Sequence, residues 1–460
     1  MTIRNCEAFD YIRIIRDKAA ANGINASFDL HIEKSHLMRI GNSSVSLNTS
    51  EHLSRLCIEV INGNKTGYHT QMGSITSPEY VEKALNIAIE KAKNAFESNY
   101  TQFQPGPTED IEKSNQFDPE LENLDSEYKV NFFKKVIETV GNKYSYSGSW
   151  SSGSVERFLI STKNKHEAWH LGTDQQFIMV LQHPTKKWEL KSALSGWRLK
   201  DFKAEDAINY FNSLLPVYEN NEGYKVKPGS YTVAFGPGAI SELLFASTEI
   251  AFNGQAFEDK ISWLCNNKIG DKIAQDFISL YDNPDSDLVF GLNFDEAGTS
   301  RKKFPLVENG IFKGVMYDIA TAAKFKKELT GHSLDSVNNV VLMPGKDSPD
   351  ILEATKDLGQ VIYIPDIHYV GIVSPTKGIL TGSSRYNAVL IEDGKMVAPL
   401  FSCRITERIG KIFNNILKMS SEEISFNLSN TYEKRTPFAL GMPSYIIAKD
   451  VMLTDSSDSF

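Results

Sequence analysis

The sequence contains few cysteines, and none of them lies close to another. The four are Cys6, Cys57, Cys265 and Cys403, and no C-x-x-C pair occurs among the 460 residues. Zinc ribbons and dithiol redox sites need closely spaced cysteines, and small disulfide-stapled domains need many more of them. The spacing argues against all three classes and predicts a reduced, cytoplasmic protein.

The sequence also lacks any apolar run of about 18 residues, the length that a membrane-spanning helix requires. Its first twenty residues, MTIRNCEAFDYIRIIRDKAA, do not have the apolar centre of a signal peptide. Basic residues are outnumbered, with 49 Lys and Arg against 58 Asp and Glu, which gives a formal net charge of −9. A surface that follows nucleic-acid phosphates needs clustered basic side chains. We therefore expect neither a membrane span nor direct binding to nucleic acid.

Aromatic residues, in contrast, are plentiful. The chain has 26 Phe and 18 Tyr and is 41% hydrophobic, which indicates mixed helices and large packed sheets with a sizeable core. The stretch VYENNEGYKVKPG, residues 217–229, has the composition of a linker. We predict an α+β fold, with an N-terminal α+β domain over residues 1–220 and a β-rich C-terminal domain over residues 228–460.

Local patterns place the individual elements. Helical spacing of apolar residues predicts helices at 6–22, 77–96, 126–140, 204–215 and 239–252, and Phe96 is expected in the buried stripe of the second. Alternation predicts strands at 26–46, 55–71, 144–149, 155–162, 170–182, 188–198 and 230–235, with a surface loop at 102–119. Helix, strands and helix thus recur at roughly 100-residue spacing, which indicates an internal duplication. One α+β domain without a repeat is the alternative.

The densest group of charged, hydroxyl-bearing and turn-forming residues lies between residues 288 and 325. Asp295, Glu296, Thr299 and Arg301 place carboxylates, a hydroxyl and a guanidinium close together around Gly298. Such a group either contacts substrate or fixes its own loop by hydrogen bonds, and we expect the structural role first. The Asn309-Gly310 pair that follows, between alternating apolar residues, predicts a β-hairpin.

A match to the zinc motif H-E-x-x-H occurs at residues 166–170, HEAWH. That motif requires a helix, because His166 and His170 must both reach one metal ion while Glu167 acts as the base. The neighbouring residues instead indicate a turn followed by a strand, in which residues four apart lie about 13 Å from each other. We therefore expect no metal here and keep His166, Glu167 and His170 as a weak alternative site.

Long stretches of the chain resemble the TldD/PmbA family, once called modulators of DNA gyrase and understood as peptidase components. The C-terminal stretches are VKPGSYTVAFGPGAISELLFASTEIAFNG, FGLNFDEAGTSRKKFPLVENGIFKGVMYDIATAA and KGILTGSSRYNAVLIEDGKMVAPLFSCRITE, and the N-terminal one is EVINGNKTGYHTQMGSITSPEYVEKALNIAIEKAKNA. The resemblance covers nearly the whole chain. It implies two domains that assemble as dimers around an enclosed active-site space, with a peptide as substrate.

The metal-bearing members of that family have a helix with the pattern L-L-H-E-x-x-x-H and a further Cys ligand near the C-terminus. The alignment without gaps from Leu243 places Phe245 and Ile250 at the two His positions and Ala246 at the Glu position. No Cys follows Cys403. The resemblance is thus to the PmbA branch (TldE-like), which lacks the metal motif and works beside a zinc-bearing TldD-like partner.

Three functions follow from these observations, and catalytic residues of this chain's own are not identified. The first is a subunit of a TldD/PmbA-type metallopeptidase system that helps proteolysis without a cofactor of its own, zinc being expected only in the partner subunit. The alternatives are a free-standing peptidase and a non-catalytic peptide-binding protein. Apolar strands such as VIYIPDIHYVGIV exceed what the C-terminal half needs for its own core, so we expect a homodimer or a heterodimer.

Overall fold

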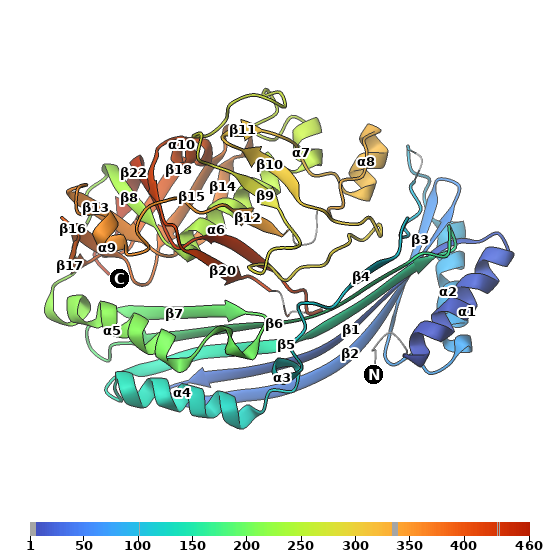
Figure 1. The fold of residues 1–460 in the computed structure, drawn as a ribbon, viewed down its shortest axis with the longest axis horizontal. Coiled ribbons are helices and arrows are strands. Elements are labelled where there is room, and N and C mark those ends of the chain that lie inside the picture. Colours follow the sequence, from blue (N-terminus) through green and yellow to red (C-terminus); the bar gives the residue numbers. More distant parts are fainter. Residues whose placement is uncertain (1–5, 101, 334–338, 430, 432) are drawn as a thin grey trace.

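The computed structural model describes residues 6–100, 102–333, 339–429, 431 and 433–460. Its N-terminal half is organised around one long, curved sheet (Figure 1). The central strands run antiparallel in the order β3-β2-β1-β5-β6, and β4 and β7 pair with different parts of β6. The strands are β1 (Asn25–Gly41), β2 (Ser44–Asn62), β3 (Lys65–Met72), β4 (Ile111–Lys113), β5 (Ser145–Ser161), β6 (Glu167–Gln182) and β7 (Glu189–Gly196).

Two pairs of helices pack against opposite ends of this sheet (Figure 1). The pairs are α1 (Glu7–Ala21) with α2 (Pro78–Asn94), and α4 (Ser126–Val140) with α5 (Ala204–Asn220). Short helices α3 (Pro119–Glu122) and η2 (Leu199–Asp201) complete this half. Helix, three antiparallel strands and helix therefore occur twice, with β1 and β5 adjacent at the centre, which is the recurrence expected from the sequence.

Several predicted boundaries are wrong. The strand predicted at 26–46 turns at Asn42 and Ser43, both with positive φ, so that β2 begins at Ser44. Residues 145–161 form one strand rather than two, and the loop at 102–119 contributes β4. Phe96 lies outside α2 and is 99% exposed, because the helix ends at Asn94 and the chain turns away.

The C-terminal half contains two further sheets. The nine-stranded sheet has the order β14-β15-β18-β22-β8-β13-β16-β17 with β19 paired to β22, and the six-stranded sheet has the order β11-β10-β9-β12-β21-β20. Their strands are β8 (Gly229–Phe235), β9 (Leu280–Asp282), β10 (Phe304–Glu308), β11 (Ile311–Phe312), β12 (Val340–Leu342), β13 (Gln360–Ile364), β14 (Ile367–Ser374), β15 (Ile379–Ser384), β16 (Val389–Glu392), β17 (Lys395–Pro399), β18 (Cys403–Arg408), β19 (Ile416–Met419), β20 (Glu423–Asn427), β21 (Ala439–Pro443) and β22 (Ile446–Ser456).

Few helices accompany these sheets, as the predicted β-rich character requires. They are α6 (Pro237–Ala246), the π-helix η3 (Ser247–Ala251), α7 (Gly254–Glu258), α8 (Ile319–Phe325), α9 (Ile351–Ala354), α10 (Ile409–Asn414) and the 3-10 turn η4 (Pro375–Lys377). The predicted hairpin is present as β10 and β11, with Asn309 and Gly310 both at positive φ in its turn.

The two halves share a hydrophobic core. Trp150 and Phe177 of the long sheet belong to the same buried cluster as Ala234 of β8 and Tyr363 of β13. Helix α5 extends to Asn220, five residues beyond its predicted end at 215, and thereby shortens the predicted linker. Because the core crosses the junction, we expect the halves to unfold together, and the division into 1–220 and 228–460 stays a prediction. Among the described residues, no helix is long and apolar enough to cross a membrane.

Candidate functional site

Helix α6 and the π-helix after it occupy the position of the expected metal motif. Pro237 supplies the first helical residue, where no backbone N–H is needed, and Ala239 N–H donates to Pro365 O at 2.8 Å. Phe252 N–H then donates to Ser247 O at 3.1 Å, a hydrogen bond between residues five apart. The single long helix predicted at 239–252 is thus an α-helix that widens into a π-turn, a feature often found at functional sites.

The side chains at this position do not fit a metal ion. A π-turn brings residues five apart toward one face, which is the spacing of Phe245 and Ile250. Phe245 is 43% exposed, Ile250 is half-buried and Ala246 is buried, and none of the three has a donor atom for zinc. Within the described part of the chain, no three His, Cys, Asp or Glu side chains form a group that could hold a metal ion.

His166 directly precedes strand β6, residues 167–170 begin that strand, and none of the five is helical. The side chain of His166 is 45% exposed and contacts Asp110, whereas Glu167 accepts two hydrogen bonds from Arg13 at 2.7 and 2.8 Å. His170 is buried, and desolvation lowers the pKa of its imidazole to about 3. The three side chains therefore have separate surroundings and do not converge on one point.

The loop that contains Asp295 fixes itself by local hydrogen bonds. Thr299 N–H donates to Asp295 Oδ1 at 2.7 Å, and Gly298 N–H donates to Asp295 O at 3.1 Å. Gly298 has φ 77°, and a Cβ there would lie 2.5 Å from the backbone N of Pro107. Only glycine fits this close approach to the N-terminal half.

The four candidate residues of this loop take different positions. Asp295 and Thr299 meet each other, while the Arg301 guanidinium donates to Asp282 Oδ1 of β9 at 2.7 Å. His332 Nε2 lies 3.3 Å from the other oxygen of Asp282. Glu296 is exposed and, together with Arg301, lines a cavity of about 110 Å³ at the junction of the two halves. The loop thus joins the two halves rather than presenting one converging set of groups.

A network of buried and half-buried ion pairs surrounds this cavity, and no local sequence pattern indicates it. Arg157 of β5 donates to both carboxylate oxygens of Asp29 at 2.9 and 2.6 Å, and its guanidinium lies 5.2 Å from the centre of the Phe294 ring. Arg435 Nε donates to Asp174 Oδ1 at 2.7 Å across a separation of 261 residues. Partners so distant in sequence produce no local pattern.

We expect Asp295→Asn to keep or increase stability at neutral pH. Burial raises the pKa of Asp295 to about 6 from 3.8, so the folded state binds its proton more tightly than the unfolded chain does. The charged form therefore costs stability above about pH 6, and this cost is absent below about pH 4. The amide keeps the acceptor for Thr299 N–H. Urea denaturation should show a gain of about 1–2 kcal/mol at pH 7.5 that disappears at pH 4.

Asp295→Ala is the matched control, because it removes the acceptor as well as the charge. It should be less stable than Asp295→Asn by about 1 kcal/mol. A clear loss of stability in Asp295→Asn at pH 7.5 would show instead that the carboxylate charge fixes the loop. Unchanged stability with lost activity of an assembled complex would assign Asp295 a functional role.

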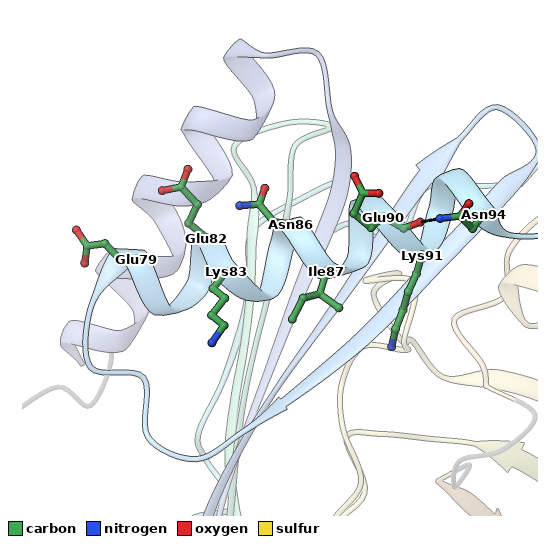
Figure 2. Close-up of a pocket in the computed structure, with 8 residues that line it drawn as sticks. All are labelled: Glu79, Glu82, Lys83, Asn86, Ile87, Glu90, Lys91 and Asn94. Carbon is green, nitrogen blue, oxygen red and sulfur yellow. Dashed lines mark hydrogen bonds between the residues drawn. The ribbon is translucent and has the colours of Figure 1, made fainter.

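A separate hollow lies along the outer face of α2. It measures about 710 Å³ and is lined only by residues of that helix. Figure 2 shows that Glu79, Glu82, Lys83 and Lys91 point in different directions along it, and the one hydrogen bond drawn joins Asn94 to the backbone of Glu90. Its charges do not converge, so we interpret this hollow as a solvated helix face.

A cleft of about 340 Å³ between the two halves has a better-organised lining. Its lining includes Lys191 and Ser195 of β7 and Ser425 and Asn427 of β20, and Ser195 Oγ donates to Ser425 O at 2.7 Å. Lys191 Nζ also contacts Asp366 beside the N-terminus of α6. Burial raises the pKa of the nearby Glu242 carboxyl on α6.

Comparison with known proteins identifies relatives that share this fold. A model of the PmbA/TldA metallopeptidase C-terminal domain matches residues 228–454. A metalloprotease of Methanocaldococcus jannaschii is 23% identical over 458 residues, covering 90% of this chain and 93% of the relative. A metalloprotease TldD homologue of Buchnera aphidicola is 23% identical, covering 81% and 80%. The crystal structure of TldE from Thermococcus kodakarensis superposes with a TM-score of 0.81 at 18% identity, covering 97% of this chain and 100% of that one.

Proposed function

The chain belongs to the TldD/PmbA family, and on this premise we propose that it is the non-metal subunit of a peptidase of that family. It would act beside a zinc-bearing, TldD-like homologue in the cytoplasm. Its own contribution would be a wall of the active-site space, a docking surface for the partner and contacts to the peptide. Its four cysteines are free thiols, in agreement with a reducing compartment.

The observation that carries this proposal is the chemistry of α6 and its π-turn. The backbone of the turn is present, but Phe245, Ala246 and Ile250 supply only carbon atoms at the three motif positions. Leu243 and Leu244 beside them are fully buried, so the helix packs as part of the core. A chain with this helix contributes structure to proteolysis, and the metal chemistry belongs to another chain.

The interdomain cleft supports a role in holding peptide. The side-chain amide of Asn387 forms hydrogen bonds with both backbone groups of Lys191, at 2.9 and 2.7 Å, on the outer edge of β7. Two residues further, Ala193 presents its backbone groups on the same edge, and within the described residues they have no partner. An extended peptide could make at Ala193 the hydrogen bonds that Asn387 makes at Lys191.

Strand β14 supports a role in assembly. It lies at the edge of the nine-stranded sheet, and two of its apolar side chains are exposed, Tyr369 by 82% and Val373 by 59%. Strand β13, also expected at an interface, is instead buried within the chain except for Gln360. Exposed apolar edge strands are usually covered by a partner, so we place partner contact at β14.

We expect peptide cleavage only when this chain is mixed with a zinc-bearing homologue. The chain alone should contain no stoichiometric zinc by elemental analysis and should not cleave a mixture of short peptides. The mixture should cleave them and should sediment as a larger species than either chain alone. The homologue stripped of zinc, mixed with this chain, is the matched control and should be inactive.

Three results would contradict the proposal. Cleavage by the chain alone, with about one zinc that is lost on His166→Ala, would favour the free-standing peptidase. Peptide binding without cleavage in every mixture would favour a binding protein. A homodimer that excludes the homologue would also remove the proposed heteromeric assembly.

A further inference from the structure

A largely apolar cavity lies beside the π-helix in the C-terminal half and is partly open to solvent. It measures about 230 Å³ and is bordered by the π-helix, by strands β9, β10 and β12, by helix α10 and by the loop over residues 263–278. Most of its lining side chains are apolar, among them Ala251, Phe252, Trp263, Ala274, Ile278 and Phe413. It is distinct from the interdomain cleft and shares no lining residue with it.

The polar groups of the lining are already engaged or lie at the rim. Ser247 Oγ donates to Leu243 O at 2.7 Å, and the side-chain amide of Asn414 donates to Ile273 O at 2.9 Å. Lys272 is exposed and pairs with Asp276 at 2.7 Å. Within the described residues, no buried side-chain atom that lacks a hydrogen-bond partner lines this cavity. The interior therefore offers no group that would orient a charged or strongly polar ligand.

Apolar side chains that face water in such a cavity cost free energy, which a bound apolar group recovers by covering them. Water gains little there, because a buried water needs two to four polar partners. A dry cavity of about 150 Å³ lined by Leu, Ile and Phe is large enough to bind benzene in another protein. The present cavity is larger and has the rings of Phe252, Trp263 and Phe413 in its wall.

We propose that this cavity is a binding site for an uncharged aromatic or branched apolar group of about the size of an indole ring. The ring edges and faces of Trp263 and Phe413 would pack against the ligand, and the wall formed by Ser247 and Ala251 couples the site to the π-turn. The group belongs either to a free small molecule or to a side chain of a bound peptide, because both present the same uncharged apolar surface to the cavity. The proposal is independent of any partner subunit.

The test measures indole binding to the full chain by thermal shift and by isothermal titration calorimetry. Indole should raise the melting temperature of the natural chain in a saturable way. Ala274→Leu fills the cavity from a loop, and Ala251→Leu fills it from the π-helix. Each should bind indole at least about tenfold more weakly, because a second group no longer fits the space.

Ala20→Leu is the matched control, since Ala20 is exposed on α1 and lines neither this cavity nor the interdomain cleft. It should bind indole as the natural chain does. The peptides Ala-Trp-Ala and Ala-Ala-Ala distinguish the two sources of the group: tighter binding of the first, lost in Ala274→Leu, assigns a side chain as the ligand. If the natural chain binds neither indole nor Ala-Trp-Ala, or if Ala274→Leu and Ala251→Leu, once shown to be folded, bind like the natural chain, the proposal is wrong.

Discussion

Arg435→Ala should lower the free energy of unfolding by about 3–5 kcal/mol, because it leaves the charge of Asp174 buried without its partner. Arg435 is 1% exposed, and its Nε donates to Asp174 Oδ1 at 2.7 Å. Its backbone N–H also donates to Glu33 Oε2 at 2.8 Å. Through these two hydrogen bonds, one from its side chain and one from its backbone, Arg435 joins the C-terminal segment to the long N-terminal sheet. Urea denaturation measured by circular dichroism gives the change.

Two controls separate the buried charge from other effects of the substitution. Lys225→Ala breaks an exposed ion pair with Asp458 and should change stability by less than about 0.5 kcal/mol. The double variant Arg435→Met with Asp174→Leu should recover much of the loss, since replacing both charges removes the unpaired one. A loss below about 1 kcal/mol for Arg435→Ala would mean that this ion pair does not hold the halves together.

Lys129→Met should stabilise the protein below about pH 7 and should remove much of its pH dependence between about pH 7 and 10. Lys129 lies on α4 and is 2% exposed, with its ammonium 2.8 Å from Ser152 Oγ and 5.7 Å from the centre of the Trp150 ring. Desolvation, with a smaller contribution from Arg435, lowers the pKa of Lys129 to about 7 from 10.5.

The sign of the effect follows from proton binding. Between about pH 7 and 10.5 the unfolded chain binds this proton and the folded chain does not, so stability rises with pH across that window. Below about pH 7 both states bind the proton, and the folded state carries the full cost of a buried charge. Removing the amine should therefore raise the free energy of unfolding at pH 6 by about 2–5 kcal/mol.

Lys135→Met on the same helix is the matched control. Lys135 is exposed and pairs with Glu205 at the surface, so its loss should leave the pH profile unchanged. Denaturation curves at pH 6, 8 and 10 for the natural chain and both variants give the comparison. Parallel pH profiles for Lys129→Met and the natural chain would show that Lys129 stays charged in the folded state.

The parts of the fold that local chemistry specifies were predictable. Ser77 and Pro78 start α2 where a hydroxyl cap and a proline at the first turn favour a helix. Asn309 and Gly310 form the turn between β10 and β11 because both tolerate positive φ. The absence of donor atoms at Phe245, Ala246 and Ile250 is also a property of the sequence, because no tertiary arrangement adds a ligand to those side chains.

The parts that depend on distant partners were not predictable. Strand β5 is continuous through Gly153 because it is paired on both sides, by β1 and β6, along its length. Phe96 was placed in the buried stripe of α2 by its spacing, yet the helix ends before it. The π-turn at Ser247–Ala251 interrupts a segment whose local pattern is that of an ordinary helix.

The sequence by itself determined the composition of the candidate site, and the tertiary structure decided its surroundings. The chemistry of a side chain depends only on its residue type. The sequence alone was therefore enough to identify the missing metal ligands and the polar loop at Asp295. The pairing of Arg435 with Asp174 spans the two halves of the chain, whereas Arg157 pairs with Asp29 inside the long sheet and Arg301 pairs with Asp282 inside the C-terminal half. Each contact forms only when separate segments of the chain pack together, because burial makes each unpaired charge costly and thereby selects its partner.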